Sequence, residues 1–195
     1  MTLVENGNLW ADIRSPAMRK TRRGLFLDRD GTLIELVDYL ADPGKVTLLT
    51  DTVSEVRRAN SAGIAVVIVT NQSGIGRGLY QWADFEAVQA RVIELLLEAG
   101  AKIDAVYACP HPPPDAGGPL ISAYRKPAPG MLMRASRDLG LDLATSRIIG
   151  DSVSDLAAGK AAGIPVGILA GTGHSERDAT AVKMLADEEF EVNFF

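Results

Sequence analysis

Cysteine is scarce in this sequence, with one residue in 195, so no internal disulfide can form, which is typical of the reducing cytoplasm. Long apolar runs are also missing. Residues 1–16 hold no apolar stretch of signal-peptide length, and no run approaches the ~20 residues of a membrane span. Basic residues are outnumbered, and the net charge of −5 argues against a nucleic acid recognised by charge. We therefore expect a cytoplasmic protein without a membrane or nucleic-acid partner.

The sequence does contain a regular alternation of short β-branched runs and longer stretches with apolar residues at helical spacing. This alternation predicts right-handed βαβ units, and so an α/β fold of the doubly wound, three-layer α/β/α type with a central parallel sheet. A hydrophobic content of 47% in 195 residues suits one core. The strands are expected at 25–27, 64–69, 103–108, 147–149 and 164–169, and helices at 50–62, 82–99, 131–139, 175–186 and one ending near 163.

The domain organisation predicted from these signals is simple. Residues 1–23 have mixed character and end in a basic cluster, so we interpret them as a leader that is packed on the domain, through Trp10, or flexible. Residues 24–195 are expected to form a single domain. Within it, residues 33–50 predict a flap, because a turn signal lies between short apolar pieces, and the proline-rich residues 109–129 predict a loop over the substrate.

The run L-F-L-D-R-D-G-T at residues 25–32 is the centre of the functional argument. As a buried parallel strand, it would carry Asp28 and Asp30 out at its carboxyl end, where open α/β sheets bind their ligands. Residues two apart on a strand point the same way, so both carboxylates can face one pocket. Adjacent negative charges are costly unless a cation joins them. The plainer alternative is a strand closed by an Asp-Gly turn.

Polar residues follow other strands in the same way. Thr70 ends the second expected strand, Lys126 lies in the proline-rich loop, and Gly150 to Asp155 read G-D-x-x-x-D after another strand. Each of these features alone has an ordinary structural explanation, such as a helix-capping aspartate. Their order and their placement at strand ends or in loops make chance agreement improbable.

Taken together, D-R-D-G-T, Thr70, Lys126 before a proline and G-D-x-x-x-D resemble the four motifs of the haloacid dehalogenase-like (HAD-like) hydrolases. The fuller wording, V-T-N-Q-S-G-I-G-R-G, C-P-H and R-K-P-x-P-G-M, resembles the histidinol-phosphatase-like branch and, within it, the heptose bisphosphate phosphatases. This resemblance spans roughly residues 25–169. It implies a fold without a large cap domain. It also implies a magnesium-dependent phosphomonoester hydrolase that acts through an aspartyl-phosphate, removing the 7-phosphate of D-glycero-D-manno-heptose 1,7-bisphosphate.

The chemistry explains why such an enzyme needs these residue types. A phosphate dianion about 4 Å from a carboxylate is repelled by about 8 kcal/mol at an effective dielectric near 20. A hard divalent cation such as Mg²⁺ offsets that repulsion. The resemblance implies that Asp28 is the nucleophile, Asp30 the acid and base, and Thr70 and Lys126 phosphate contacts. It further implies that Mg²⁺ is held by Asp28, Asp151 and the Asp30 carbonyl, with Asp155 supporting the site.

Substrate contacts are expected next to these motifs. The planar guanidinium groups of Arg77 and Arg125 suit bidentate binding of a second phosphate, and the alternative is that they are surface arginines in loops. Asn71, Gln72 and Ser73 are expected to contact sugar hydroxyls.

The sequence departs from these relatives at a loop that often binds a structural zinc through C-x-H and a later C-x-C. Cys109 and His111 remain, but the second pair falls at Ser122 and Tyr124, so we expect no zinc. In addition, Ser152 stands where heptose bisphosphate phosphatases often carry lysine, which leaves the substrate open.

Four functional hypotheses follow. We expect a sugar bisphosphate phosphatase that works as a monomer on a small phosphorylated sugar. The alternatives are histidinol-phosphate hydrolysis, which would need a pocket for an imidazole, and a nucleic-acid end phosphatase, which the acidic charge disfavours. A non-catalytic phosphate-binding protein is disfavoured because every catalytic position is filled.

Overall fold

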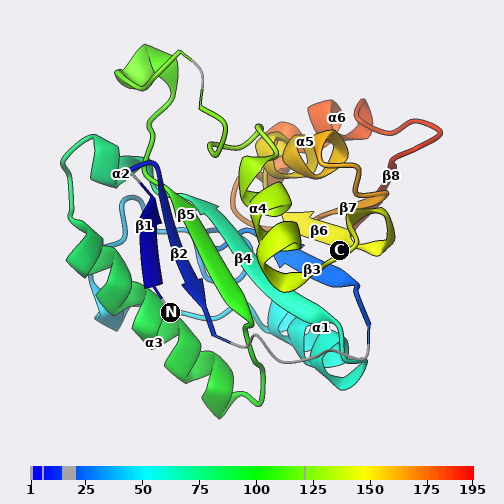
Figure 1. Cartoon of the computed structure of the whole chain (residues 1–195), viewed down its shortest axis with the longest axis horizontal. Coiled ribbons are helices and arrows are strands. Elements are labelled where there is room, and N and C mark those ends of the chain that lie inside the picture. Colours follow the sequence, from blue (N-terminus) through cyan, green and yellow to red (C-terminus); the bar gives the residue numbers. More distant parts are fainter. Residues whose placement is uncertain (1, 6, 15–20, 121) are drawn as a thin grey trace.

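Figure 1 shows the computed structural model, which describes residues 2–5, 7–14, 21–120 and 122–195. The described strands form one sheet in the order β1-β2-β5-β4-β3-β6-β7-β8. All neighbours from β5 to β8 run parallel, and helices cover both faces, so the predicted three-layer α/β/α fold is confirmed. The strands are β1 Thr2–Glu5, β2 Leu9–Ile13, β3 Gly24–Leu27, β4 Ala65–Asn71, β5 Ala105–Cys109, β6 Arg147–Gly150, β7 Val166–Leu169 and β8 Glu191–Phe194. The α-helices are α1 Thr50–Ser61, α2 Ser73–Gly76, α3 Trp82–Glu98, α4 Gly130–Leu139, α5 Val153–Ala161 and α6 Ser175–Lys183, with short 3₁₀ turns at Pro43–Lys45, Pro114–Ala116 and Leu143–Thr145.

The central strand β3 is buried on both faces, which explains its unbroken apolar sequence. Leu25 and Leu27 enter a core cluster with α1 and α3, whereas Phe26 enters the opposite cluster with α4 and α5. Alternate residues of one strand therefore hold the two helical layers together.

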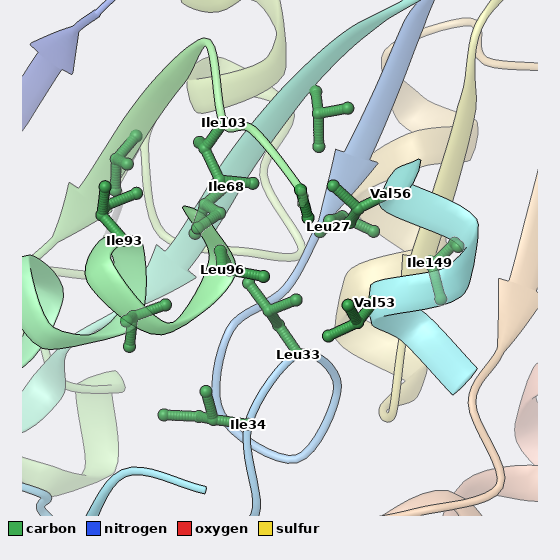
Figure 2. Packing of buried hydrophobic residues seen from close by; sticks show 14 of the residues in the cluster. Leu27, Leu33, Ile34, Val53, Val56, Ile68, Ile93, Leu96, Ile103 and Ile149 are labelled. Atoms are coloured by element: carbon green, nitrogen blue, oxygen red, sulfur yellow. The ribbon is translucent and has the colours of Figure 1, made fainter. Parts of the chain in front are cut away.

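The flap, residues 33–50, is anchored in the first core. Leu33 and Ile34 are fully buried in the same cluster as Val53 of α1 and Leu96 of α3 (Figure 2). An isolated bridge from Ile34 to Leu48 brings the two ends of the flap together. The middle of the flap is consequently held over the carboxyl edge of the sheet.

The N-terminal residues correct the expectation of a simple leader. β1 and β2 form an antiparallel hairpin, and β2 pairs antiparallel with β5, so this edge of the sheet is mixed rather than parallel. The hairpin covers backbone groups of β5 that would otherwise form an exposed edge. Trp10 is buried as expected, with its ring centroid 6.4 Å from that of Trp82 and 5.0 Å from that of Phe85. Of the basic cluster, Arg19 and Lys20 lie outside the described residues.

The N-cap position of α1 carries no capping side chain. Leu49 occupies that position, and its N–H donates to the carbonyl of Leu33 in the flap. Contact with the flap thus fixes the start of α1. In the described parts of the chain, no helix is both long and apolar enough to cross a membrane.

Candidate active site

The carboxyl ends of three adjacent strands, β4, β3 and β6, meet at a cavity of about 320 Å³. Asp28 and Asp30 follow β3, Thr70 is the residue before the last of β4, and Asp151 follows β6. The flap, the loop before α4 and the start of α6 complete the cavity wall. Parallel strands thus bring together residues that are far apart in the sequence.

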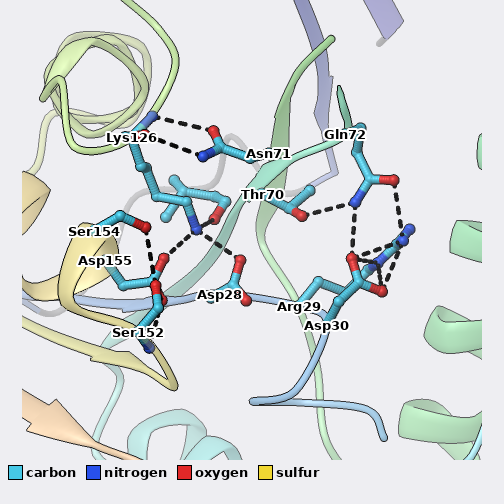
Figure 3. Close-up of polar contacts among 11 residues, drawn as sticks. Asp28, Arg29, Asp30, Thr70, Asn71, Gln72, Lys126, Ser152, Ser154 and Asp155 are labelled. Atoms are coloured by element: carbon cyan, nitrogen blue, oxygen red, sulfur yellow. Dashed lines mark hydrogen bonds and ion pairs between the residues drawn. The ribbon is translucent and has the colours of Figure 1, made fainter. Parts of the chain in front are cut away.

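Lys126 stands at the centre of the site, between two carboxylates (Figure 3). Its Nζ lies 2.6 Å from Asp28 Oδ1 and 2.5 Å from Asp155 Oδ1, and it also donates to the carbonyl of Val69 at 2.7 Å. The Lys126 side chain is only 2% exposed. Lys126 therefore fixes the rotation of the Asp28 carboxylate while remaining next to the cavity.

Burial dominates the electrostatics of the carboxylates. It raises the pKa of Asp28 well above its usual range; Lys126 opposes this shift, while Asp155, Asp151 and Asp30 add to it. Burial likewise raises the pKa of Asp151 to about 6, with the charge of Asp155 as the next cause. Burial alone would lower the pKa of Lys126, but Asp155 and Asp28 outweigh it and raise the pKa above its usual value. One ammonium does not balance this many carboxylates, so the site favours an added cation.

The residues present fit a divalent cation. Asp28, Asp151 and Asp155 each offer an oxygen, and these oxygens lie within 4.8 Å of one another. Hard oxygen donors are what Mg²⁺ prefers. Space for Asp151 comes from two glycines, because a Cβ on Gly31 or Gly173 would lie within 2.5 Å of its Oδ2.

Asp155 is engaged on both oxygens by the protein itself. Oδ1 pairs with Lys126, and Oδ2 accepts the N–H of Ser152 at 3.1 Å and its hydroxyl at 2.6 Å. This capping box starts α5 and fixes the loop that carries Asp151. The geometry supports Asp28 and Asp151 as metal ligands and Asp155 as the residue that holds the site.

Asp30 is turned away from Lys126, toward Arg29 and Gln72 (Figure 3). Its Oδ2 accepts Gln72 Nε2–H at 2.8 Å, and its Oδ1 accepts Arg29 Nη2–H at 2.9 Å. The side chain is 21% exposed, so it remains in reach of the cavity. Gln72 also donates to Thr70 Oγ1 at 2.8 Å, which leaves the Thr70 hydroxyl hydrogen for a phosphate oxygen.

Two of the residues expected to contact the sugar form hydrogen bonds within the protein. Asn71 forms a reciprocal pair with the backbone of Lys126, accepting its N–H at 3.1 Å and donating to its carbonyl at 3.2 Å. Gln72 is only 3% exposed and uses its amide on protein groups. Both amides thus hold neighbouring groups of the site, but both residues also line the cavity, so their contact with the substrate stays a prediction. Ser73, at the start of α2, lines the cavity as expected.

The two candidate arginines differ in their position relative to the cavity. Arg125 lines the cavity and donates from Nη1 to the carbonyl of His111 at 2.7 Å. Arg77 is not among the cavity-lining residues; its guanidinium lies 5.3 Å from the ring centroid of Tyr39 and donates to the Tyr39 hydroxyl. Arg77 thus contacts the flap residue Tyr39, which itself lines the cavity, and its contact with a phosphate stays a prediction.

The loop with Cys109 and His111, where the sequence predicts no zinc, is held by hydrogen bonds. Ser122 Oγ lies 2.7 Å from His111 Nδ1 and accepts the N–H of Arg125 at 3.1 Å. His111 Nε2 lies 3.0 Å from Asn8 Oδ1, and Cys109 Sγ lies 3.9 Å from Ser122 Oγ. Burial, aided by Arg125, lowers the pKa of His111 and favours the neutral ring that can donate to Asn8 and accept from Ser122. This donor set is not a tetrahedral zinc site.

Sequence analysis missed several residues of the site. Arg29, between the two motif aspartates, is 1% exposed and contacts Asp30. Tyr80 reaches the cavity from the turn before α3, and His174 and Arg177 line it from the region of α6. Only Arg29 had a signal in the sequence, since an arginine at the end of a buried strand is unusual; the others depend on tertiary folding.

Phosphoryl transfer is the chemistry that suits a nucleophilic carboxylate, a buried ammonium and a cation site at the carboxyl edge of a doubly wound sheet, and these features define a HAD-like phosphatase. Comparison with known proteins supports this class. Residues 123–189 match a family model described as HAD-hydrolase-like.

Individual relatives identify the family within this class. D-glycero-beta-D-manno-heptose-1,7-bisphosphate 7-phosphatase of Mesorhizobium japonicum is 46% identical over 84% of this chain and 76% of its own length. D-glycero-alpha-D-manno-heptose-1,7-bisphosphate 7-phosphatase of Burkholderia mallei is 38% identical over 82% of this chain and 85% of its own length. The crystal structure of D,D-heptose 1.7-bisphosphate phosphatase from B. bronchiseptica, complexed with magnesium and phosphate, has a TM-score of 0.75 and 33% identity over 87% of this chain and 91% of that one. This chain belongs to the D-glycero-D-manno-heptose-1,7-bisphosphate 7-phosphatase family of HAD-like hydrolases, so the predicted family is confirmed.

Proposed function

We propose that this protein is a Mg²⁺-dependent phosphatase that removes the 7-phosphate from D-glycero-D-manno-heptose 1,7-bisphosphate through an aspartyl-phosphate. The observation that carries the proposal is the position of Lys126, buried between Asp28 and Asp155. The names of relatives that share 46% and 38% identity support the choice of substrate.

In the first half of the reaction, an oxygen of Asp28 bonds to phosphorus as the bond from phosphorus to the C7 oxygen breaks. Asp30 gives its proton to that oxygen, which leaves as an alcohol. Lys126 keeps the Asp28 carboxylate oriented and pairs with a phosphoryl oxygen, while the Thr70 hydroxyl donates to another.

In the second half, the Asp30 carboxylate takes a proton from water, and the water oxygen bonds to phosphorus as the bond to Asp28 breaks. Inorganic phosphate leaves, and Asp28 is free again beside a protonated Asp30. One carboxylate is thus the nucleophile and the other is the acid and base.

Asp28, Asp151 and the Asp30 carbonyl would hold Mg²⁺, with Asp155 supporting the site. When bound, the cation supplies positive charge against the phosphate dianion, which a carboxylate at about 4 Å otherwise repels by about 8 kcal/mol. Support for this arrangement comes from the cluster of three carboxylates in this chain and from the magnesium in the related structure.

The 1-phosphate needs a cation away from the reacting centre. We assign this role to Arg125, which lines the cavity from the loop before α4 and donates to the carbonyl of His111. Ser73 remains a predicted sugar contact. We further propose that the protein acts as a monomer and, since its single cysteine, Cys109, is a free thiol, that it works in the cytoplasm.

The test is phosphate release from both anomers of the heptose bisphosphate, histidinol phosphate and a 3′-phosphorylated oligonucleotide, each with Mg²⁺ or EDTA. We expect one phosphate per heptose bisphosphate, with the 1-phosphate retained in ³¹P NMR, and no release in EDTA. A higher kcat/KM for histidinol phosphate or for the oligonucleotide would overturn the substrate assignment, and absence of Mg²⁺-dependent release from all of them would overturn the enzyme class.

A further inference from the structure

The guanidinium of Arg29 is buried beside the acid and base of the proposed reaction. Its Nε lies 3.1 Å from each oxygen of Asp30, and its Nη2 lies 2.9 Å from Oδ1. Its third nitrogen, Nη1, has no hydrogen-bond partner among the described residues. Burying a guanidinium is costly unless it is well paired. The position of Arg29 is thus better explained by Asp30 than by packing alone.

Gln72 joins Arg29 to the rest of the site (Figure 3). Its Nε2 donates to Asp30 Oδ2 and to Thr70 Oγ1, each at 2.8 Å. Its Oε1 accepts Arg29 Nη2–H at 3.1 Å and the Tyr80 hydroxyl at 2.6 Å. Both donors and both acceptor positions of this amide are therefore in use.

Arg29 and Tyr80 fix which end of the Gln72 amide faces Asp30. The guanidinium of Arg29 can only donate, so the amide oxygen lies on its side. The Tyr80 hydroxyl donates to the same oxygen, and its burial raises the pKa of Tyr80 to about 12, so it keeps its proton at neutral pH. The amide nitrogen is then directed to Asp30 and Thr70.

We propose that Arg29, Gln72 and Tyr80 are positioning residues that hold the Asp30 carboxylate for proton transfer. The proposal rests on the role of Asp30 in the proposed function. Three donors from Arg29 and Gln72 match the carboxylate that exists once the proton has passed to the leaving oxygen, so they stabilise the transition state more than the ground state. They also fix a short side chain that could otherwise adopt several rotamers.

Leaving groups of different basicity distinguish this role from a structural one. An alkoxide needs a proton to leave, whereas 2,4-dinitrophenolate does not. We would measure kcat/KM, which reports the steps up to the first bond cleavage, for an alkyl phosphate and a series of aryl phosphates. The variants are Tyr80→Phe, Gln72→Met and Arg29→Lys.

We expect Arg29→Lys to lose about tenfold or more on the alkyl phosphate and almost nothing on 2,4-dinitrophenyl phosphate, because a lost hydrogen bond to a charged group costs about that factor. Tyr80→Phe should show the same trend with a smaller loss, and Gln72→Met should add a loss common to all substrates, because it also removes the donor to Thr70 Oγ1. Asp30→Asn should show the same trend with a larger slope. In the Asp30→Asn background, Tyr80→Phe should cost nothing further. Equal losses across the series, or a full additional loss in that background, would overturn the proposal.

Matched controls come from the same fold. Tyr107 is a buried tyrosine bound to Asp138, and Gln89 is a buried glutamine on α3, so Tyr107→Phe and Gln89→Met should leave the leaving-group slope unchanged. Because Arg29 also packs over Phe85 at 5.2 Å, Arg29→Lys can unfold the protein, and the other two variants then decide. The wild-type protein on the same substrates tests the proposed function separately.

Discussion

At the scale of single residues, the site depends on a carboxylate that is kept reactive by its surroundings. Asp28 is buried with Lys126 on one oxygen, and no neutral side chain of similar shape can attack phosphorus. Asp28→Asn should therefore lower kcat by about 10³-fold or more while the protein stays folded, because the amide relieves repulsion among the carboxylates. Phosphate release and circular dichroism check this, with Asp51→Asn on α1 as the control. Substantial Mg²⁺-dependent turnover by the Asp28 variant would contradict the aspartyl-phosphate mechanism.

Arg125 allows a second prediction at this scale, since it is assigned to a phosphate that does not react. Arg125→Ala should lower kcat/KM for the heptose bisphosphate by about 10- to 150-fold and for an aryl phosphate much less, because a charge-assisted contact is lost only where it exists. Steady-state kinetics on both substrates provide the measurement, and Arg91→Ala on the surface of α3 is the matched control. Equal losses on both substrates would instead assign Arg125 a general role.

The meeting of the residues proposed for the chemistry was predictable, because most of them directly follow a buried strand. Asp28, Asp151 and Lys126 meet at one edge of the sheet, as their motifs indicate. The hydrogen bonds of Asn71 and Gln72 within the protein were not predictable, since nothing in the sequence tells whether an amide faces the substrate or a neighbouring backbone. Their partners lie 55 and 42 residues away in the chain.

At the scale of elements, the buried parallel strands were the most predictable part of the fold. A strand covered on both faces needs a nearly unbroken apolar sequence, as in β3 and β4. The hairpin of β1 and β2 was not predicted, because an edge strand carries a weak pattern and its pairing depends on β5. The same dependence on tertiary contact explains the uncapped start of α1.

The loop before α4 gives a prediction about zinc. Hydrogen bonds among Asn8, His111 and Ser122 join this loop to the N-terminal hairpin. We predict well under one zinc per chain by elemental analysis, and an unchanged melting temperature when zinc is chelated in the presence of Mg²⁺. Ser122→Ala should lower the melting temperature, since it leaves His111 and the Arg125 N–H without their partner.

A stoichiometric zinc bound through Cys109 and His111 would contradict this prediction. Ser61→Ala is a suitable control for the Ser122 variant, because that hydroxyl bonds within α1 to Arg57 and lies far from the loop in sequence. Ser61→Ala should leave the kinetics on the heptose bisphosphate unchanged, whereas Ser122→Ala should raise KM because it displaces Arg125.

For the whole molecule, the same carboxylates that would hold Mg²⁺ destabilise the metal-free fold. Burial raises the pKa of Asp151 from 3.8 to about 6, and that of Asp28 moves in the same direction. At pH values between the pKa of such a carboxyl group in the unfolded state and its higher pKa in the folded state, the folded state binds more protons than the unfolded state. Stability without metal should consequently fall as the pH rises from about 4 to about 6, and stay reduced above that range.

Mg²⁺ binds the ionised carboxylates and offsets this loss, so its effect on stability should depend on pH. At about 100 times its dissociation constant, a ligand adds about 2.7 kcal/mol, which for a chain of this size raises the melting temperature by about 5–10 °C. We predict a gain of that size at about pH 7.5 and a clearly smaller one at about pH 5, where Asp151 holds its proton and competes with the cation. Thermal denaturation with and without Mg²⁺ at both pH values is the measurement. Asp151→Asn should melt at a higher temperature than the wild type in EDTA at about pH 7.5, and it should gain little from Mg²⁺. If the wild type gains equally at both pH values, or if Asp151→Asn gains as much as the wild type, the cation is held elsewhere.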